Sequence, residues 1–280
     1  MEQLCRKKKM SRSELLAQIK LWYNGYSWDG VTFVYNPFSV LSFFKKRGQF
    51  RNHWFSTGTP TFLVNLAKKY FYYDFDGIQA NAISFETYDI ANLEMIPLLF
   101  QTGFLTIKEE DDVGFFTLGY PNKEVKDSML QHLITAFCHE ESAGTATHIS
   151  QLRKAFLQHD METVIRIVNS LFKSIPHHIF IKEREAYFHS IVYLTFLYLG
   201  QYIEAEVNTS NGRIDAVIET PERMYILEFK LDKDANAALA QIKEKGYADK
   251  YRYKKKELFA FGINFSSEEK GVNDWLLKEI

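Results

Sequence analysis

The chain has 280 residues, of which 46% are hydrophobic and 25% charged, and its formal net charge is −1. This composition is typical of a soluble globular protein with room for two domains, each with its own core. A nearly neutral chain has no overall field that attracts nucleic acid, so such binding would have to rest on a local basic patch. Only two cysteines occur, Cys5 and Cys138, which argues against a disulfide framework and favours a reduced, cytoplasmic setting.

No membrane span or signal peptide is expected. The longest apolar run, residues 190–200, is shorter than the roughly 20 residues that a membrane span requires. The first 16 residues run directly into an amphipathic helix pattern without an apolar core or a cleavage site. We therefore expect no membrane partner.

The first third of the chain predicts helices separated by loops. One helix begins after Ser13, the expected N-cap, and stops at Asn24-Gly25. Further helices begin near Pro37 and near Thr59. The glycine-containing loop before Thr59 lacks the G-K-[S/T] ending of a phosphate-binding P-loop, which occurs nowhere in the chain. ATP hydrolysis by this chain is therefore not expected.

Residues 92–121 predict a helix and then a β-hairpin, the outline of a winged-helix unit, which we place at about 90–135. Such units either bind DNA or pack between domains. Acidic residues at the hairpin tip would repel phosphates, which favours packing. These residues are Glu109, Glu110, Asp111 and Asp112. Helices follow, and a boundary expected near Pro176 separates a mostly helical region, 1–175, from a second domain, 176–280.

Two local clusters suggest a metal site at first sight. Cys138, His139 and Glu140 are consecutive, and consecutive residues of a helix do not share a face, so one ion cannot take all three. His177 and His178 are a pair without distant partners. Surface or capping roles are the favoured interpretation for both clusters.

The last third predicts a helix over residues 183–200, three strands over 202–209, 213–220 and 225–232, a helix over 234–251, and a strand over 257–264. Short turns rich in Asn, Gly and Pro join the three strands, which indicates consecutive antiparallel hairpins. The order is helix, three strands, helix, strand.

Acidic and basic side chains interrupt these strands at particular positions. Glu228 and Lys230 share one face of the third strand, while Phe229 points to the other. Asp215 lies on the neighbouring strand, and strands about 4.8 Å apart bring it beside Glu228. Two carboxylates at that separation repel unless a cation lies between them, and Mg²⁺ prefers such oxygen ligands. Lys230 would then orient a nucleophilic water or stabilise charge on a phosphate.

Each feature also has an ordinary structural explanation. An E-x-K sequence on a strand is usually a solvated cross-strand ion pair. Glu185 and His189 are one turn apart on a helix, where they would simply be neighbours on the same helix face. Gln241 is equally consistent with a surface position. A basic cluster near the proposed site is by default a solvated face, although it would also suit a nucleic-acid backbone. Its members are Lys243, Lys245, Lys250, Arg252, Lys254, Lys255 and Lys256.

The motifs "RID" (213–215) and "EFK" (228–230), with an acidic helix before and a glutamine-bearing helix after, resemble the PD-(D/E)XK nuclease superfamily. More closely, the chain resembles the C-terminal part of bacterial proteins that join an AAA-ATPase-like region to such a nuclease domain. The motifs "WYNGY", "YNPFSVLSFF", "WFSTGTPTFLV" and "LLFQTGFLTI" resemble the end of the ATPase-like region, and "EAYFHS", "GRIDAVI", "YILEFKL" and "QIKEKGYADKY" resemble the nuclease. The nucleotide-binding half that should precede residue 1 in such proteins is missing, so the chain is expected to be either a fragment or a shortened relative. The resemblance implies an α/β architecture, α+β overall, with an αβββαβ nuclease core.

By position, the resemblance implies that Asp215 and Glu228 bind the metal, with the main-chain carbonyl of Phe229 as a further ligand. Lys230 corresponds to the catalytic lysine. The implied cofactor is Mg²⁺ or Mn²⁺, and the implied partner is nucleic acid, with DNA favoured over RNA.

Three further positions follow from the same resemblance. Glu185 matches the acidic residue of the leading helix and Gln241 a supporting polar position, while Tyr247 matches more weakly. Two classes of function stay open: a metal-dependent phosphodiesterase, and a catalytically silent binding or regulatory module that docks an ATPase region.

Overall fold

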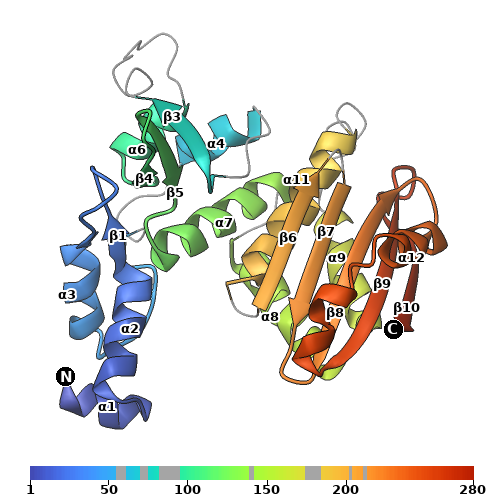
Figure 1. The fold of residues 1–280 in the computed structure, drawn as a ribbon, viewed down its shortest axis with the longest axis horizontal. Coiled ribbons are helices and arrows are strands. Elements are labelled where there is room, and N and C mark those ends of the chain that lie inside the picture. Colours follow the sequence, from blue (N-terminus) through green and yellow to red (C-terminus); the bar gives the residue numbers. More distant parts are fainter. Residues whose placement is uncertain are drawn as a thin grey trace. The chain divides into compact units, whose positions relative to one another are not determined.

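The computed structural model describes residues 1–54, 61–69, 75–81, 95–138, 142–173, 184–201, 204–210 and 213–280. The fold is α+β (Figure 1). Contacts within the chain divide it into two compact units, Met1–Met129 and Leu130–Ile280. This division lies well before the boundary expected near Pro176, which itself falls outside the described residues. Two helices expected in the first region therefore belong to the second unit.

The N-terminal unit begins with three helices and a small two-stranded sheet. These elements are α1 (Glu2–Lys8), α2 (Arg12–Tyr23), β1 (Asn24–Tyr26), β2 (Val34–Tyr35) and α3 (Pro37–Lys45). The sequence predicted Ser13 as the N-cap of α2, but the N-cap is Ser11. Ser11 and Glu14 form a capping box, in which each side chain accepts a hydrogen bond from the other's backbone N–H. The glutamate three residues after Ser11 makes this serine the better cap.

A second small sheet completes the N-terminal unit. Its elements are α4 (Thr61–Lys69), β3 (Ile78–Asn81), α6 (Met95–Gln101), β4 (Thr106–Glu110) and β5 (Phe115–Gly119), with strand order β3-β5-β4. The predicted hairpin and its acidic tip are present, since β4 and β5 pair antiparallel around residues 111–114. The helix α6 before the hairpin begins at Met95, and residues 82–94 lie outside the described part. The winged-helix assignment stays a prediction.

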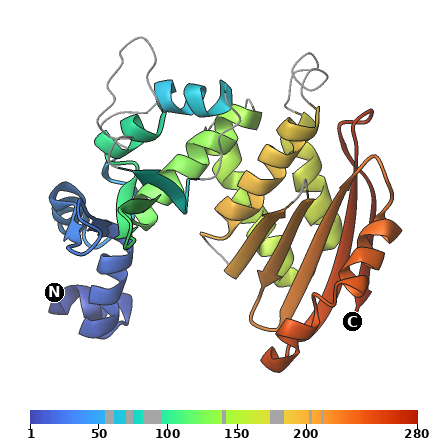
Figure 2. The same cartoon turned by 45° about the horizontal axis from the view of Figure 1, so that its top comes forward.

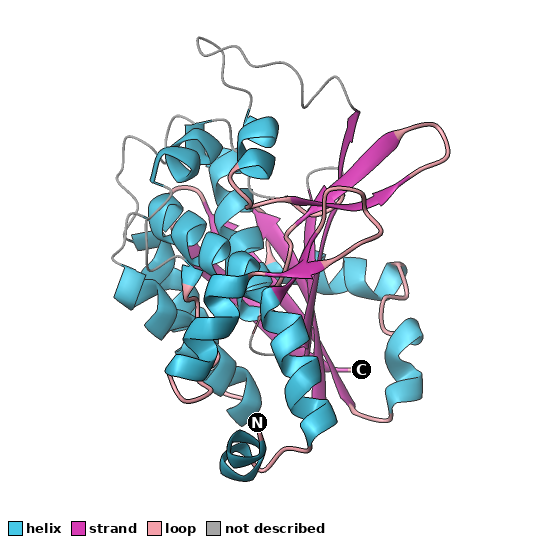
Figure 3. Ribbon diagram, turned by 90° about the vertical axis from the view of Figure 1, so that its left-hand side faces the viewer, coloured by secondary structure: helices cyan, strands magenta, loops and turns pink. Residues whose placement is uncertain are grey.

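The C-terminal unit is a five-stranded sheet with helices on both faces (Figures 2 and 3). After α7 (Lys123–Cys138), which contains the division between the units, come α8 (Ser142–Gln158), α9 (Met161–Lys173), α11 (Arg184–Leu199), β6 (Glu204–Ser210), β7 (Arg213–Glu219), β8 (Arg223–Leu231), α12 (Ala235–Glu244), the 3₁₀ helix η2 (Asp249–Lys254), β9 (Glu257–Ser266) and β10 (Gly271–Glu279). The strand order is β10-β9-β8-β7-β6, and the pair β8–β9 is parallel while the others are antiparallel.

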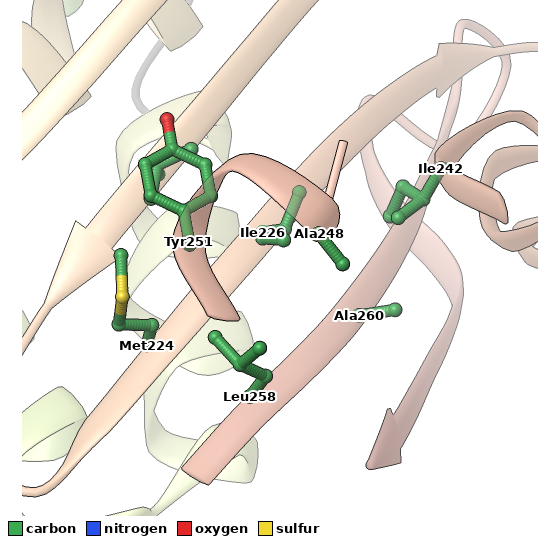
Figure 4. Packing of buried hydrophobic residues seen from close by; sticks show 8 residues of the cluster. Met224, Ile226, Ile242, Ala248, Tyr251, Leu258 and Ala260 are labelled. Atoms are coloured by element: carbon green, nitrogen blue, oxygen red, sulfur yellow. The ribbon is translucent and has the colours of Figure 1, made fainter. Parts of the chain in front are cut away.

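Alternating residues of the central strands pack against different helices. On one face, Tyr225 lies against Phe156 of α8 and Phe229 against Phe196 of α11. On the other face, side chains of β7, β8, β9, α12 and η2 form a cluster (Figure 4). Its buried members are Val217, Met224, Ile226, Ile242, Ala248, Tyr251, Leu258 and Ala260. The sheet is thus covered on both sides, as expected when a strand pair is parallel.

Two elements differ from the sequence expectations. The helix predicted over 234–251 ends at Glu244, and Gly246, with φ of 60°, turns the chain into the separate helix η2. A left-handed residue ends an α-helix, and glycine adopts that conformation without steric cost. The strand β10 was not predicted, since its charged and apolar residues do not alternate regularly. It lies at the edge of the sheet, where only one side is paired.

Candidate active site

The site is built on the face of β8 that α12 covers. Glu228 and Lys230 are two residues apart on β8, so they share this face with Ile226 of the buried cluster. Phe229 points to the opposite face, where its ring lies 5.1 Å from that of Phe196. The parity predicted for these three residues is therefore correct.

Glu228 and Lys230 are buried, with side-chain exposures of 0% and 9%. The Lys230 Nζ donates a hydrogen bond to Glu228 Oε1 and another, at 2.5 Å, to Gln241 Oε1 of α12. The E-x-K sequence is thus a buried ion pair and not a solvated one. An ammonium group has three N–H donors, and these two contacts account for two of them. The pair is held between a strand and a helix.

Gln241 contributes a second polar group to this place. Its Oε1 accepts from Lys230, while its Nε2 is buried and has no hydrogen-bond acceptor among the described residues. A buried amide N–H without an acceptor is unfavourable, and such groups often mark a place where water, an ion or a ligand binds. Gln241 is therefore half-buried and hydrogen-bonded to Lys230, and not the fully exposed residue of the alternative interpretation.

Asp215 of β7 is the backbone register partner of Glu228, as the sequence predicted for neighbouring strands. Its side chain lies outside what the structure describes. The pairing of β7 with β8 ends at this residue pair, whereas β8 continues beside β9 to Leu231. The backbone of Phe229 therefore lies just past the point where β7 and β8 separate.

The remaining predicted positions have different surroundings. Glu185 is the second residue of α11, and its side chain is not among those described. Tyr247 packs against the buried cluster under α12, and the Lys245 Nζ lies 5.5 Å from the centre of its ring. This makes Tyr247 a packing residue. In the described parts of the chain, no group of three or more His, Cys, Asp or Glu side chains is arranged to hold a metal ion.

The two local clusters with metal-type residues fall largely outside the described part. Cys138 is buried at the end of α7, while His139 and Glu140 are not described. His177 and His178 are likewise beyond the residues that the structure describes.

The predicted basic cluster is partly neutralised by a glutamate that the sequence analysis did not single out. Glu219, at the end of β7, accepts hydrogen bonds from Lys254 and, at 2.6 Å, from Lys256. Burial acts to raise the pKa of Glu219, but these lysines outweigh it and hold the pKa below its usual value. Arg252 in turn pairs with Asp249 at 3.2 Å. These three cations are therefore already bound to carboxylates.

A second residue missed by the sequence analysis is Asn264, which β9 places in register with Lys230. It is buried, with an exposure of 1%. Its Oδ1 accepts from the Lys233 backbone N–H at 2.9 Å, and its Nδ2 donates to Asn273 Oδ1 at 2.9 Å. A polar residue in the apolar stretch "FAFGINF" was a signal that could have identified it. Asn264 fixes the chain where it leaves β8.

No helix in the described part of the chain combines the length and the apolar character that crossing a membrane requires.

Comparison with known proteins agrees with this architecture for the C-terminal segment. A curated protein of Azotobacter chroococcum mcd 1, described as "Uncharacterized protein in vnfD 5'region", is 35% identical over 274 residues. That alignment covers 94% of this chain, and the chain spans about half, 52%, of the relative's length. No solved structure is significantly similar to the chain. Residues 183–275 match the family model described as "PD-(D/E)XK nuclease superfamily". Within the α+β fold, residues 183–275 are thus similar to the PD-(D/E)XK nuclease superfamily.

Proposed function

We propose that the C-terminal unit hydrolyses phosphodiester bonds of DNA with the help of a bound divalent metal ion. The observation that carries this proposal is the buried Lys230, held by Glu228 and Gln241 where strands β7 and β8 separate. Burial of an ion pair costs desolvation energy, and such groups are retained at functional sites more often than a stability argument explains. The superfamily match over residues 183–275 supports the same chemistry.

The donor set fits a hard divalent cation. Asp215 and Glu228 are partners in the backbone register, so two carboxylates accompany one lysine, a net negative charge. Residues two apart on a strand share a face, and Asp215 is two residues from Val217 of the cluster under α12. In this proposal Asp215, Glu228 and the main-chain carbonyl of Phe229 hold Mg²⁺ or Mn²⁺. When bound, such an ion supplies Lewis acidity and lowers the pKa of a coordinated water.

The chain's own residues would do the remaining work. Lys230 has one further N–H donor, which would orient the attacking water or donate to a non-bridging phosphate oxygen as negative charge develops there. Gln241 would hold the ammonium in place through its Oε1 and would offer its buried Nε2 as a donor. Glu185, at the start of α11, is proposed as an accessory acid. Covering helices would keep bulk water away and strengthen these contacts.

The test combines metal binding with cleavage. Calorimetric titration of Mg²⁺ and Mn²⁺ into the full chain is compared with Asp215→Asn, and plasmid and oligonucleotide DNA are incubated in the same buffers. Lys278→Met, which replaces an exposed lysine at the far edge of the sheet, is the matched control for Lys230→Met. We expect binding and cleavage to be lost together in Asp215→Asn, cleavage to be lost in Lys230→Met, and Lys278→Met to retain both.

A catalytically silent module is the competing function. The absence of metal binding and of cleavage in the unmodified chain would refute the proposal and favour that module. Cleavage of RNA in preference to DNA would correct the substrate class. The family match is confined to residues 183–275 and gives no support to an ATPase-like region, so the proposal does not include one.

A further inference from the structure

The N-terminal unit carries an open apolar groove that is separate from the nuclease-like domain. The groove has a volume of about 550 Å³ and lies along α2 and α3 (blue in Figure 1). Both helices contribute apolar side chains to it, and they include Leu16, Ile19, Pro37, Val40, Leu41 and Phe44. Leu41 is 69% exposed and Leu16 43% exposed. Contiguous exposed apolar side chains of this kind are typical of interaction sites.

Helix α3 has apolar side chains on two faces, although a surface helix normally needs only one. Phe43 is fully buried in the cluster with Leu15 and Tyr23 of α2, which accounts for the first face. The second face runs through Pro37, Val40, Leu41 and Phe44, the spacing i, i+3, i+4, i+7. The first face joins α3 to α2, and Val40 also packs against that cluster, while Pro37, Leu41 and Phe44 stay exposed.

The N-terminal segment that carries the groove is strongly basic. Residues 1–54 contain ten Lys or Arg and three Asp or Glu, a formal charge of +7 in a chain whose total is −1. Within the described residues, the structure gives none of these lysines and arginines a carboxylate partner. Two of the three acids are engaged locally, because Glu14 belongs to the capping box and Asp29 accepts from backbone N–H groups of Val31 and Thr32. The positive charge is therefore not compensated.

Helix geometry places part of this charge at the edge of the groove. On α2, Arg12 and Lys20 are each four residues from Leu16 and therefore lie one turn away on the same side. On α3, Lys45 is four residues beyond Leu41. An occupant of the groove thus meets apolar side chains in the centre and cations at both ends.

We propose that this groove binds an acidic amphipathic helix of a partner protein. Apolar residues of the partner at spacing i, i+3, i+4, i+7 would fill the groove between α2 and α3, the mode by which helices bind in apolar grooves. Aspartate and glutamate residues on the flanks of that helix would face the lysines and arginines, which adds specificity and speeds association.

Charge and polarity argue against the other occupants. A second copy would bring together two N-terminal segments that each carry a formal charge of +7, and like charges across an interface are unfavourable. A nucleic acid would need polar contacts to phosphates or bases, whereas the groove is lined by apolar side chains. An anionic membrane surface suits a protruding apolar face better than a concave one.

The test uses a random-peptide display library on the immobilised full chain, with counter-selection on Leu41→Asp. The selected peptides are then synthesised and their affinities measured by fluorescence anisotropy against three variants. Leu41→Asp places a negative charge in the groove, and Lys20→Glu/Lys45→Glu reverses the sign of the charge at its edge. Leu21→Asp is the matched control, because Leu21 is a 52% exposed leucine of α2 that does not line the groove.

We expect selected peptides with apolar residues at i, i+3, i+4, i+7 and acids between them. Their affinity should fall about tenfold or more, equivalent to about 1.4 kcal/mol, in Leu41→Asp and in Lys20→Glu/Lys45→Glu, and stay unchanged in Leu21→Asp. The proposal is overturned if no peptide is selected through the groove, or if the selected peptides are basic or lack this spacing. It is equally overturned if no peptide competes for the groove and Leu41 instead mediates dimerisation, binding to phosphatidylglycerol vesicles or binding to DNA.

Discussion

Replacing Lys230 by methionine tests whether the buried ion pair of β8 supports the fold as well as the proposed chemistry. Methionine has a similar volume but no charge, so the substitution leaves the Glu228 carboxylate at 0% exposure without the ammonium beside it. Removing one partner of a buried ion pair costs about 3–5 kcal/mol. Gln241 also loses the donor to its Oε1, worth about 1 kcal/mol. We therefore expect a loss of roughly 4 kcal/mol in the free energy of unfolding.

Hydrogen exchange followed by mass spectrometry measures this loss separately in each unit. Because each 1.36 kcal/mol corresponds to a factor of ten, about 4 kcal/mol lowers the protection of the most stable β8 and β9 amides about 10³-fold. Peptides from α2 and α3, in the other unit, report whether the effect is local. Lys278→Met is the control, since it removes an exposed lysine. The double variant Glu228→Gln/Lys230→Met removes both charges and should recover most of the protection.

Two results would refute this reasoning. Unchanged protection in Lys230→Met would mean that the carboxylate of Glu228 does not depend on Lys230. A double variant as unstable as the single one would mean that packing, and not an uncompensated charge, determines the loss. The measurement also guides the cleavage assay, because a loss of cleavage in Lys230→Met is evidence for a catalytic role only at temperatures where the variant remains folded.

Three further predictions concern other parts of the chain. Burial raises the pKa of Glu124, although its Oε1 accepts hydrogen bonds from the His53 and Trp54 backbone N–H groups. The stability linked to protonation of Glu124 is therefore present at acid pH and is lost as the pH rises through the folded-state pKa. Glu124→Gln should therefore gain stability relative to the unmodified chain as pH rises in urea titrations, and a pH-independent difference would contradict this. Gly262→Ala should lower the melting temperature, because its Cβ would lie 2.5 Å from the first carbonyl oxygen of α12; an unchanged value would show that the helix shifts freely. Ser11→Ala should cost about 1 kcal/mol of stability in the N-terminal unit by loss of the N-cap, measured by urea unfolding, and Ser11→Asp should restore it.

Local sequence patterns determined most of the elements of this protein. Strand alternation placed Glu228 and Lys230 on one face and Phe229 on the other, and turn residues placed the hairpins that bring Asp215 into register with Glu228. Pro37 correctly marked the start of α3. These features depend on residues within a few positions of each other, so their physical cause is present in the local sequence.

The tertiary structure decided which of these residues meet. The hydrogen bond from Lys230 to Gln241 joins residues 11 positions apart, and it exists because α12 packs across β8 and β9. The pairing of Glu219 with Lys254 and Lys256 spans 35 and 37 positions, and it neutralises part of the basic cluster that the sequence presents. Sheet order and helix packing arise from the burial of apolar surface by the whole unit. Local periodicity indicates which face of a strand or helix a residue occupies. What that face contacts is determined only by the burial of apolar surface in the whole unit.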